Sequence, residues 1–284
     1  MNGLIFSIEE FAVYDGEGIR VNVFFKGCPL RCKWCHNPEG WENKIQIVKN
    51  PNGCIECGIC KGVCQSPGDC VLCGKCVVNC PRGLIRKSGE WYTSDKLVEK
   101  LLKFEKILKR CNGGLTFSGG EVLLQAEFLC EVLDKTKQMH RIIETSGFGD
   151  KDKFAEVLKR VDFIYYDLKI MNSKKHIEYT GVDNKIILEN AKLLFESGVP
   201  CVIRVPYISG VNTDALNIRA LCEFIKDAEN VQKVELLMYS IMAGAKYKLA
   251  GLEYEYDFKQ PSDEDLCVAD SIFKEYNIDY SVRN

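Results

Sequence analysis

Three cysteines near the start of this 284-residue chain are the residues best suited to chemistry. Cys28, Cys32 and Cys35 follow the spacing C-x3-C-x2-C, and no fourth cysteine lies close enough in the sequence to complete a local set. Three thiolates within so short a stretch suit an iron–sulfur cube that keeps one iron open for a small molecule. The alternative is a zinc site with Cys54 or His36 as its fourth ligand.

The residues around these cysteines favour the iron–sulfur interpretation. The spacing resembles the motif with which the radical SAM superfamily binds S-adenosylmethionine (SAM). Residues 15–20 (D-G-E-G-I-R), 27–30 (G-C-P-L) and 35–39 (C-H-N-P-E) resemble, more narrowly, the activating enzymes of glycyl radical enzymes. The first of these motifs usually has proline where this chain has Glu17.

The resemblance implies an oxidoreductase whose substrate is a second protein. Its cluster would bind the amino and carboxylate groups of SAM, and one electron would cleave SAM to methionine and a 5′-deoxyadenosyl radical. That radical would abstract hydrogen from a glycine of a partner glycyl radical enzyme, and a low-potential donor such as flavodoxin or ferredoxin would supply the electron. Two alternatives are a radical SAM enzyme that modifies another peptide and a plain electron carrier.

Eight further cysteines form an internal repeat within residues 43–90, a stretch with few aliphatic side chains. Each half has the spacing C-x2-C-x2-C-x3-C of bacterial two-cluster ferredoxins, in which the fourth cysteine of each run ligates the other cluster. The predicted ligand sets are Cys54, Cys57, Cys60 and Cys80 for one cluster, and Cys70, Cys73, Cys76 and Cys64 for the second. Zinc knuckles are the alternative, but zinc usually takes two well-separated pairs. We therefore predict three [4Fe-4S] clusters per chain, two of which form an electron relay.

Three polar motifs each follow a predicted strand, and a barrel would bring them to one mouth. They are Gly119-Gly120-Glu121, Glu144-Thr145 and Asp167-Leu168-Lys169. The resemblance places the first motif beside the amino group of SAM, because glycines permit close backbone approach and Glu121 can accept from an ammonium. The family motif ends in proline where this chain has Val122. Taken alone, Gly-Gly-Glu would be a turn into a helix with an acidic first turn.

The charged members of these motifs allow two interpretations. Lys169 can pair with the carboxylate of SAM, while Asp167, Glu144 and Thr145 supply hard oxygens suited to a monovalent or divalent cation. A salt-bridged barrel rim explains the same residues without any ligand. Arg204, inside an apolar strand, also needs a partner, either the carboxylate or ribose of SAM or an internal carboxylate.

Two further candidates rest on their position in the family pattern. His36 follows the last cluster cysteine, and we expect it to make a hydrogen bond beside the cluster rather than to ligate iron. Ser240 ends the sequence Met238-Tyr239-Ser240, where many family members have Pro-Tyr-His. Contacts to SAM from this loop are therefore open.

Helix and strand signals alternate after residue 91, which predicts parallel strands joined by crossover helices. With residues 20–26 the chain has six βα units, and the resemblance implies a partial (β/α)6 TIM-like barrel with a small cysteine-rich, ferredoxin-like insert. The predicted barrel comprises residues 1–42 and 91–284, and the predicted insert comprises residues 43–90. A doubly wound open sheet would give the same alternation.

Composition and charge narrow the choice of partners. Hydrophobic residues make up 46% of the chain and charged residues 27%, with a net charge of −2. These values describe an ordinary globular protein and give no reason to expect nucleic acid or an anionic membrane as partner. No signal peptide or membrane span is evident, so we expect a cytoplasmic protein, and we predict a monomer.

Overall fold

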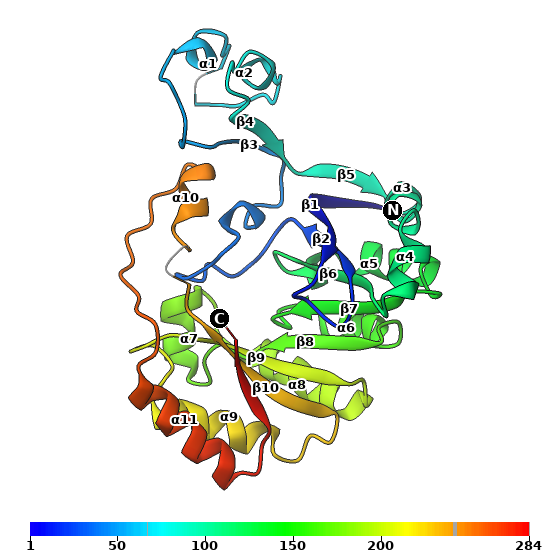
Figure 1. The fold of residues 1–284 in the computed structure, drawn as a ribbon, viewed down its shortest axis with the longest axis vertical. Helices are drawn as coiled ribbons and strands as arrows, with labels where there is room; N and C mark the ends of the chain where they lie inside the picture. The colour runs from blue at the N-terminus through cyan, green and yellow to red at the C-terminus, as the bar shows by residue number, and fades with distance from the viewer. Residues whose placement is uncertain (67, 241–242, 284) are drawn as a thin grey trace.

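The computed structural model describes residues 1–66, 68–240 and 243–283, and within them one nine-stranded sheet dominates (Figure 1). Six parallel strands lie side by side in chain order: β2 (Arg20–Phe25), β6 (Gly114–Gly119), β7 (His140–Thr145), β8 (Phe163–Asp167), β9 (Cys201–Tyr207) and β10 (Val231–Met238). β11 (Tyr280–Arg283) extends this parallel set beyond β10. β1 (Asn2–Ala12) and β5 (Glu90–Thr93) join the other edge in antiparallel pairing.

The strand order decides between the two predicted architectures. A doubly wound sheet reverses its strand order at a switch point, whereas barrel winding keeps successive strands adjacent. Here the order from β2 to β10 follows the chain without reversal, and the sheet ends at β5 and β11. The prediction of a partial barrel is therefore confirmed, and the doubly wound alternative is wrong.

Helices cover the outer face of the sheet because each carries one apolar stripe. The longer ones are α3 (Ser94–Leu102), α5 (Ala126–Lys135), α6 (Lys151–Leu158), α7 (Ser173–Thr180), α8 (Lys185–Ser197), α9 (Ala215–Ile225) and α11 (Asp263–Glu275). Shorter helices are α4 (Glu105–Arg110) and α10 (Ala245–Leu249). Side-chain caps mark several starts, as at Asp150, Asp214 and Ser262, where the first orphan backbone N–H groups find an acceptor. No helix in the described ranges is both long and apolar enough to cross a membrane.

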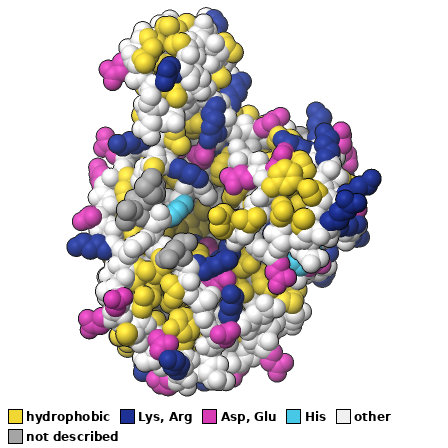
Figure 2. All heavy atoms as spheres, viewed as in Figure 1, with side chains coloured by type: hydrophobic (Ala, Val, Ile, Leu, Met, Phe, Trp, Pro, Cys, Tyr) yellow, Lys and Arg dark blue, Asp and Glu magenta, His cyan; other side chains and the backbone are white. Residues whose placement is uncertain are grey.

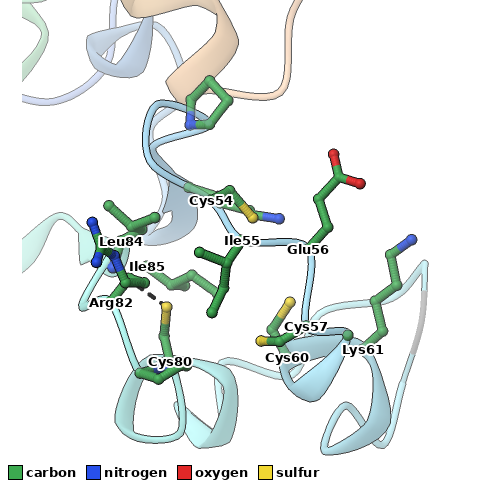
Figure 3. A pocket seen from close by; sticks show the side chains of 14 residues that line it. Cys54, Ile55, Glu56, Cys57, Cys60, Lys61, Cys80, Arg82, Leu84 and Ile85 are labelled. Atoms are coloured by element: carbon green, nitrogen blue, oxygen red, sulfur yellow. Dashed lines mark hydrogen bonds between the residues drawn. The ribbon is translucent and has the colours of Figure 1, made fainter.

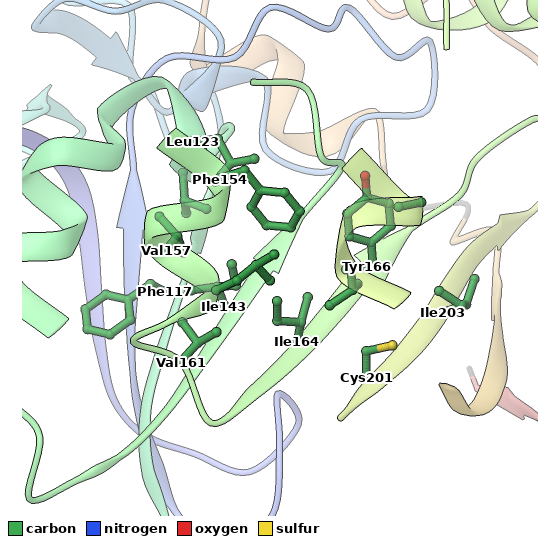
Figure 4. Packing of buried hydrophobic residues seen from close by; sticks show 14 of the residues in the cluster. Phe117, Leu123, Ile143, Phe154, Val157, Val161, Ile164, Tyr166, Cys201 and Ile203 are labelled. Atoms are coloured by element: carbon green, nitrogen blue, oxygen red, sulfur yellow. The ribbon is translucent and has the colours of Figure 1, made fainter. Parts of the chain in front are cut away.

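The main core lies between strands and helices. Phe117, Ile143 and Ile164 are paired in register on β6, β7 and β8, and all three are fully buried. They pack against Phe154 and Val157 of α6 (Figure 4). Because strand side chains alternate between faces, the neighbours of these residues point into the barrel, where the polar groups gather.

Residues 46–88 form a projection whose base is a two-stranded antiparallel sheet (Figure 1). Its strands are β3 (Gln46–Lys49) and β4 (Ile85–Ser88), and the short helices α1 (Ile59–Gly62) and α2 (Lys75–Val78) lie beyond them. The cysteine repeat is also a backbone repeat, since Gly58 and Gly74 begin the two helices in the left-handed conformation, at φ 73° and 76°. Hydrophobic side chains are visible on the surface of the projection (Figure 2), and Val71 and Val78 are exposed within it.

Candidate functional site

A cavity of about 350 Å³ lies at the carboxyl ends of the parallel strands. Eleven residues predicted from the sequence line it: Cys28, Cys32, Cys35, His36, Gly119, Gly120, Glu144, Thr145, Asp167, Lys169 and Arg204. They come together because parallel strands end at one edge, so loops distant in the chain converge there. Two predicted site residues, Glu121 and Ser240, are not among the lining residues.

Alternation along the strands selects which side chains face the cavity. Glu144 pairs in register with Tyr165, and Asp167 pairs with Arg204. These side chains point into the barrel, while Ile143 and other alternate residues point to the helices. On β7 and β8 the polar residues Glu144 and Asp167 thus face the inside of the barrel, while Ile143 and Tyr166 face the helices.

The three lining cysteines lie in the loop after β2, and backbone bonds fix both ends of that loop. Gly27 N donates to Gly40 O at 2.7 Å, and Cys28 N donates to Trp41 O at 2.9 Å. Burial raises the pKa of the Cys28 thiol, and it raises that of Cys32 to about 12 even though nearby Lys169 opposes the shift. Thiolates at these positions need a compensating cationic group, so the donor set fits an iron–sulfur cluster.

Neighbouring cysteines of the projection are grouped as the two predicted sets require, and the two clusters themselves stay a prediction. Cys54, Cys57, Cys60 and Cys80 line a second cavity of about 470 Å³ (Figure 3). Burial raises the pKa of Cys76, and so does its proximity to Cys70, Cys73 and Cys64, the other three members of the second set. The backbone N–H of Leu84 donates to the Cys80 sulfur at 3.4 Å, a contact of the kind that tunes cluster potentials. The crossing of Cys64 and Cys80 between the two sets is the feature that a two-cluster ferredoxin requires.

Gly119 and Gly120 allow a close backbone approach, but the backbone that they approach belongs to the end of β2 and the residues just after it. A Cβ on Gly119, whose φ is 120°, would lie 2.4 Å from Phe25 N, and one on Gly120 would lie 2.1 Å from Gly27 O. Gly120 N donates to Phe25 O at 2.7 Å. The two glycines therefore seat the end of β6 against the start of the cysteine loop, and any larger residue would push the two apart.

Glu121 is not a lining residue of the cavity, and its carboxylate is bonded within the protein; a contact with the amino group of SAM stays a prediction. Glu121 is 1% exposed, and its oxygens accept from Leu123 N at 3.1 Å, Thr145 Oγ1 at 2.5 Å, and both N and Oγ of Ser146 at 2.9 and 2.5 Å. Four donors fill the acceptor positions of a carboxylate. Glu121 thus ties the loop after β7 to the loop after β6, and burial raises its pKa despite these donors.

The charged lining residues form the salt-bridged rim that was one of the two interpretations. Lys169 Nζ lies 2.7 Å from Asp167 Oδ2, and Arg204 contacts Glu144 and lies 3.1 Å from Glu235. Burial opposes both cations, but the carboxylates raise the pKa of Lys169 and of Arg204 above their ordinary values. In the described part of the chain no three His, Cys, Asp or Glu side chains group so as to hold a single metal ion. A cation at Asp167 stays a prediction.

His36 lines the cavity, where burial and the nearby Lys246 lower its pKa. The last lining residue of the β10 loop is Tyr239, and Ser240 follows it. Sequence reasoning missed Ser118, which donates to Glu144 at 2.6 Å, and Glu235, which accepts from Arg204. Both are polar residues at inward positions of apolar strands, and that alternation is the signal that could have found them.

Replacing Glu121 by alanine should destabilise the protein strongly. The change leaves four buried donors without an acceptor, and we expect a loss of about 3–5 kcal/mol in the free energy of unfolding. Denaturant unfolding under anaerobic conditions measures it. Exposed Glu127, which pairs with Lys153 at 3.0 Å, is the matched control, and Glu127→Ala should change stability little. A loss at Glu121 no larger than at Glu127 would contradict the assignment.

Glu144 should make stability depend on pH. Burial, reinforced by Asp15 and Asp167 against the attraction of Arg204, raises its pKa from 4.5 to about 7. Between these values the folded state holds more protons than the unfolded state, so this group's contribution to stability is lost as pH rises toward 7. Glu144→Gln should therefore gain about 1–2 kcal/mol relative to the unchanged protein between pH 5.5 and pH 7.5. Urea midpoints at both pH values test this, and a difference that does not change with pH would refute it.

Comparison with known proteins agrees with this site. The sequence model of the Radical SAM superfamily matches residues 22–221. The choline trimethylamine-lyase activating enzyme of Oleidesulfovibrio alaskensis is 36% identical over 98% of this chain and 97% of its own. The trans-4-hydroxy-L-proline dehydratase activating enzyme of Clostridioides difficile is 35% identical over 99% of both chains. A solved domain of a pyruvate-formate lyase-activating enzyme from Bacteroides vulgatus matches with a TM-score of 0.52 and 30% identity, covering 61% of this chain and 99% of that one.

The family match includes the loop that carries Cys28, Cys32 and Cys35 and the strands from β6 to β9 that end at the cavity. The two enzyme relatives extend over nearly the whole chain, the projection with its eight cysteines included. The chain therefore belongs to the radical SAM superfamily and, within it, to the activating enzymes of glycyl radical enzymes.

Proposed function

We propose that this protein, acting as a monomer, installs a radical on a glycine of a separate glycyl radical enzyme, using SAM, three [4Fe-4S] clusters and a low-potential donor such as flavodoxin or ferredoxin. The observation that carries the proposal is the single cavity lined by Cys28, Cys32 and Cys35 together with the strand-end residues. With a cluster on these cysteines, one electron would split SAM into methionine and a 5′-deoxyadenosyl radical, which takes a Cα hydrogen from the partner's glycine.

The chain's own residues would bind and orient SAM. Gly119 and Gly120 line the cavity beside the cysteine loop, so their backbone carbonyl oxygens can accept hydrogen bonds from the amino group of SAM. Lys169 lies close enough to Cys32 to lower the pKa of that thiol. The Lys169 ammonium, which pairs with Asp167, can also pair with the carboxylate of SAM, either together with Asp167 or in its place. Trp34, Trp41 and Tyr239 line the same cavity and would keep water from the reacting atoms.

The salt-bridged rim is better suited to recognising SAM than to binding a cation tightly. Asp167 and Glu144 already pair with Lys169 and Arg204, so a bound cation would have to displace one of these partners. Arg204 also stacks over the ring of Tyr165 at 3.5 Å, which fixes the guanidinium at the cavity wall. Polar atoms of the ribose or carboxylate of SAM can then approach groups whose positions are set in advance.

The projection would serve electron transfer. Its eight thiols complete two four-cysteine sets, which leaves no open iron for a second SAM site. The crossed grouping of Cys54, Cys57, Cys60 and Cys80 around one cavity supports this assignment. A role in binding the partner enzyme is the alternative, and the last prediction of the Discussion separates the two.

The test combines product analysis with spectroscopy. The anaerobically reconstituted protein, SAM and titanium(III) citrate should yield 5′-deoxyadenosine and methionine without any partner. Addition of a glycyl radical enzyme encoded beside this gene should give the doublet EPR signal of a glycyl radical, and deuterium at the glycine Cα should appear in 5′-deoxyadenosine. Formation of 5′-deoxyadenosine without transfer of deuterium from any glycine would favour modification of another peptide.

A further inference from the structure

The loop that carries Cys28, Cys32 and Cys35 is bonded at both ends to the projection. Before the loop, Lys26 is 0% exposed, and its Nζ donates to Glu39 O and, at 2.8 Å, to Gln46 Oε1 of β3. After the loop, the Glu39 carboxylate accepts from Arg86 Nη2 at 2.7 Å and from Ser88 Oγ at 3.0 Å, both on β4. We call these five residues the anchor.

The burial of its polar groups distinguishes the anchor from the surface ion pairs of this protein. Glu39 is 6% exposed and Ser88 is 0% exposed, while most ion pairs in this protein join exposed side chains. A buried charge that loses its partner costs several kcal/mol, so these groups hold one arrangement. Burial also lowers the pKa of Lys26 to about 8, although Glu39 and Glu42 oppose that shift. The motif that follows Cys35 therefore has a structural reason to end in a glutamate.

The anchor leads directly to one of the two cysteine sets. Ile85 lines the cavity of Cys54, Cys57, Cys60 and Cys80, and the next residue, Arg86, bonds Glu39. Lys49, at the end of β3, lines the same cavity. Strands rise only about 3.3 Å per residue, so this short ladder sets the separation between that cavity and the cysteine loop. The other set also lies near this ladder, since α2, which carries Cys76, contacts β4.

We propose that Glu39, together with Lys26, is a positioning residue that fixes the Cys54 set next to the first cluster. This inference rests on the proposed relay. Glu39 contacts neither SAM nor a cluster ligand in this assignment, and it acts by holding β3 and β4 against the cysteine loop. Without these contacts the distance between the Cys54 set and the first cluster increases, so the last electron transfer becomes slower. The binding and cleavage of SAM do not change.

The test uses the reconstituted holoenzyme with Glu39→Ala, Glu39→Gln and, as matched control, Glu42→Gln. Glu42 pairs with Arg31 at 3.2 Å, and both side chains are about half exposed. In Glu39→Ala we expect unchanged iron content and unchanged 5′-deoxyadenosine formation with titanium(III) citrate, but a fall of about 10–100-fold with reduced flavodoxin. The Glu39→Gln variant keeps an acceptor for Arg86 and Ser88 and should recover most of the rate, and Glu42→Gln should match the unchanged protein.

Two measurements do not depend on turnover. In Glu39→Ala, β3 and β4 should exchange amide hydrogens faster, and the EPR spectrum of the fully reduced protein should show weaker spin coupling between the first cluster and its neighbour. If Glu39→Ala loses iron, Arg86→Met, which removes one bond from an exposed partner, replaces it in the same comparisons. Equal rates with flavodoxin and unchanged coupling would overturn the anchor. If reduced flavodoxin does not supply electrons to the unchanged protein through the projection, the proposed relay is overturned instead of the anchor.

Discussion

The triple variant Cys28→Ala, Cys32→Ala, Cys35→Ala, reconstituted without oxygen, should hold about eight irons per chain, and the unchanged protein should hold about twelve. The three cysteines line a cavity between the barrel strands, whereas the other eight lie in a projection with its own two-stranded base. The sites should therefore load independently. Iron and sulfide analysis measures the difference, and loss of all iron from a protein that remains folded would contradict independent sites.

The same change should abolish SAM cleavage. Cys32→Ala alone should yield neither 5′-deoxyadenosine nor methionine with titanium(III) citrate, because no other set leaves an iron open for SAM. Cys267→Ala is the matched control, since Cys267 is exposed on α11 and lies outside all three sets. It should keep about twelve irons and full turnover. Turnover by Cys32→Ala above the level of a protein-free reaction would disprove the assignment of the SAM site.

The cluster residues could be predicted from the sequence because short-range spacing determines them. Cysteines two or three residues apart reach one cluster whatever the rest of the chain does, and Cys64 and Cys80 follow from the repeat. The strand-end residues were predictable for a different reason. Glu144, Asp167 and Lys169 each follow an apolar run, and parallel strands carry their ends to one edge.

What the sequence could not show is which partner each buried group takes. The oxygens of Glu121 accept hydrogen bonds from Thr145 and Ser146, which lie at the end of β7 and just after it, more than twenty residues away in the sequence. Arg204 was left between a cofactor and an internal carboxylate, and the structure pairs it with Glu144 and Glu235. Lys26 ends an apolar run and gives no local sign that it is fully buried. Such contacts depend on the packing of distant elements, which periodicity does not encode.

Removing one cysteine from each set of the projection should separate electron supply from catalysis. In Cys57→Ala/Cys73→Ala, activation and SAM cleavage with reduced flavodoxin should fall by about 10–100-fold. With titanium(III) citrate, a small reductant that can reach the first cluster directly, much of the SAM cleavage should survive. Cys57 lines the cavity shared with Cys80, and Cys73 neighbours Cys76, so the pair disrupts both sets at once.

The comparison between the two reductants is informative only if the variant keeps its first cluster and its fold. The projection buries little apolar surface beyond Val48 and Ile85, and loss of two clusters can unfold it locally. The variant should therefore be shown to keep about four irons and to bind SAM as tightly as the unchanged protein. Equal losses with both reductants in such a protein would exclude the relay and leave bracing of the fold or docking of the partner as the role of the projection. A loss confined to flavodoxin would mean that electrons reach Cys28, Cys32 and Cys35 through the cysteines of the projection.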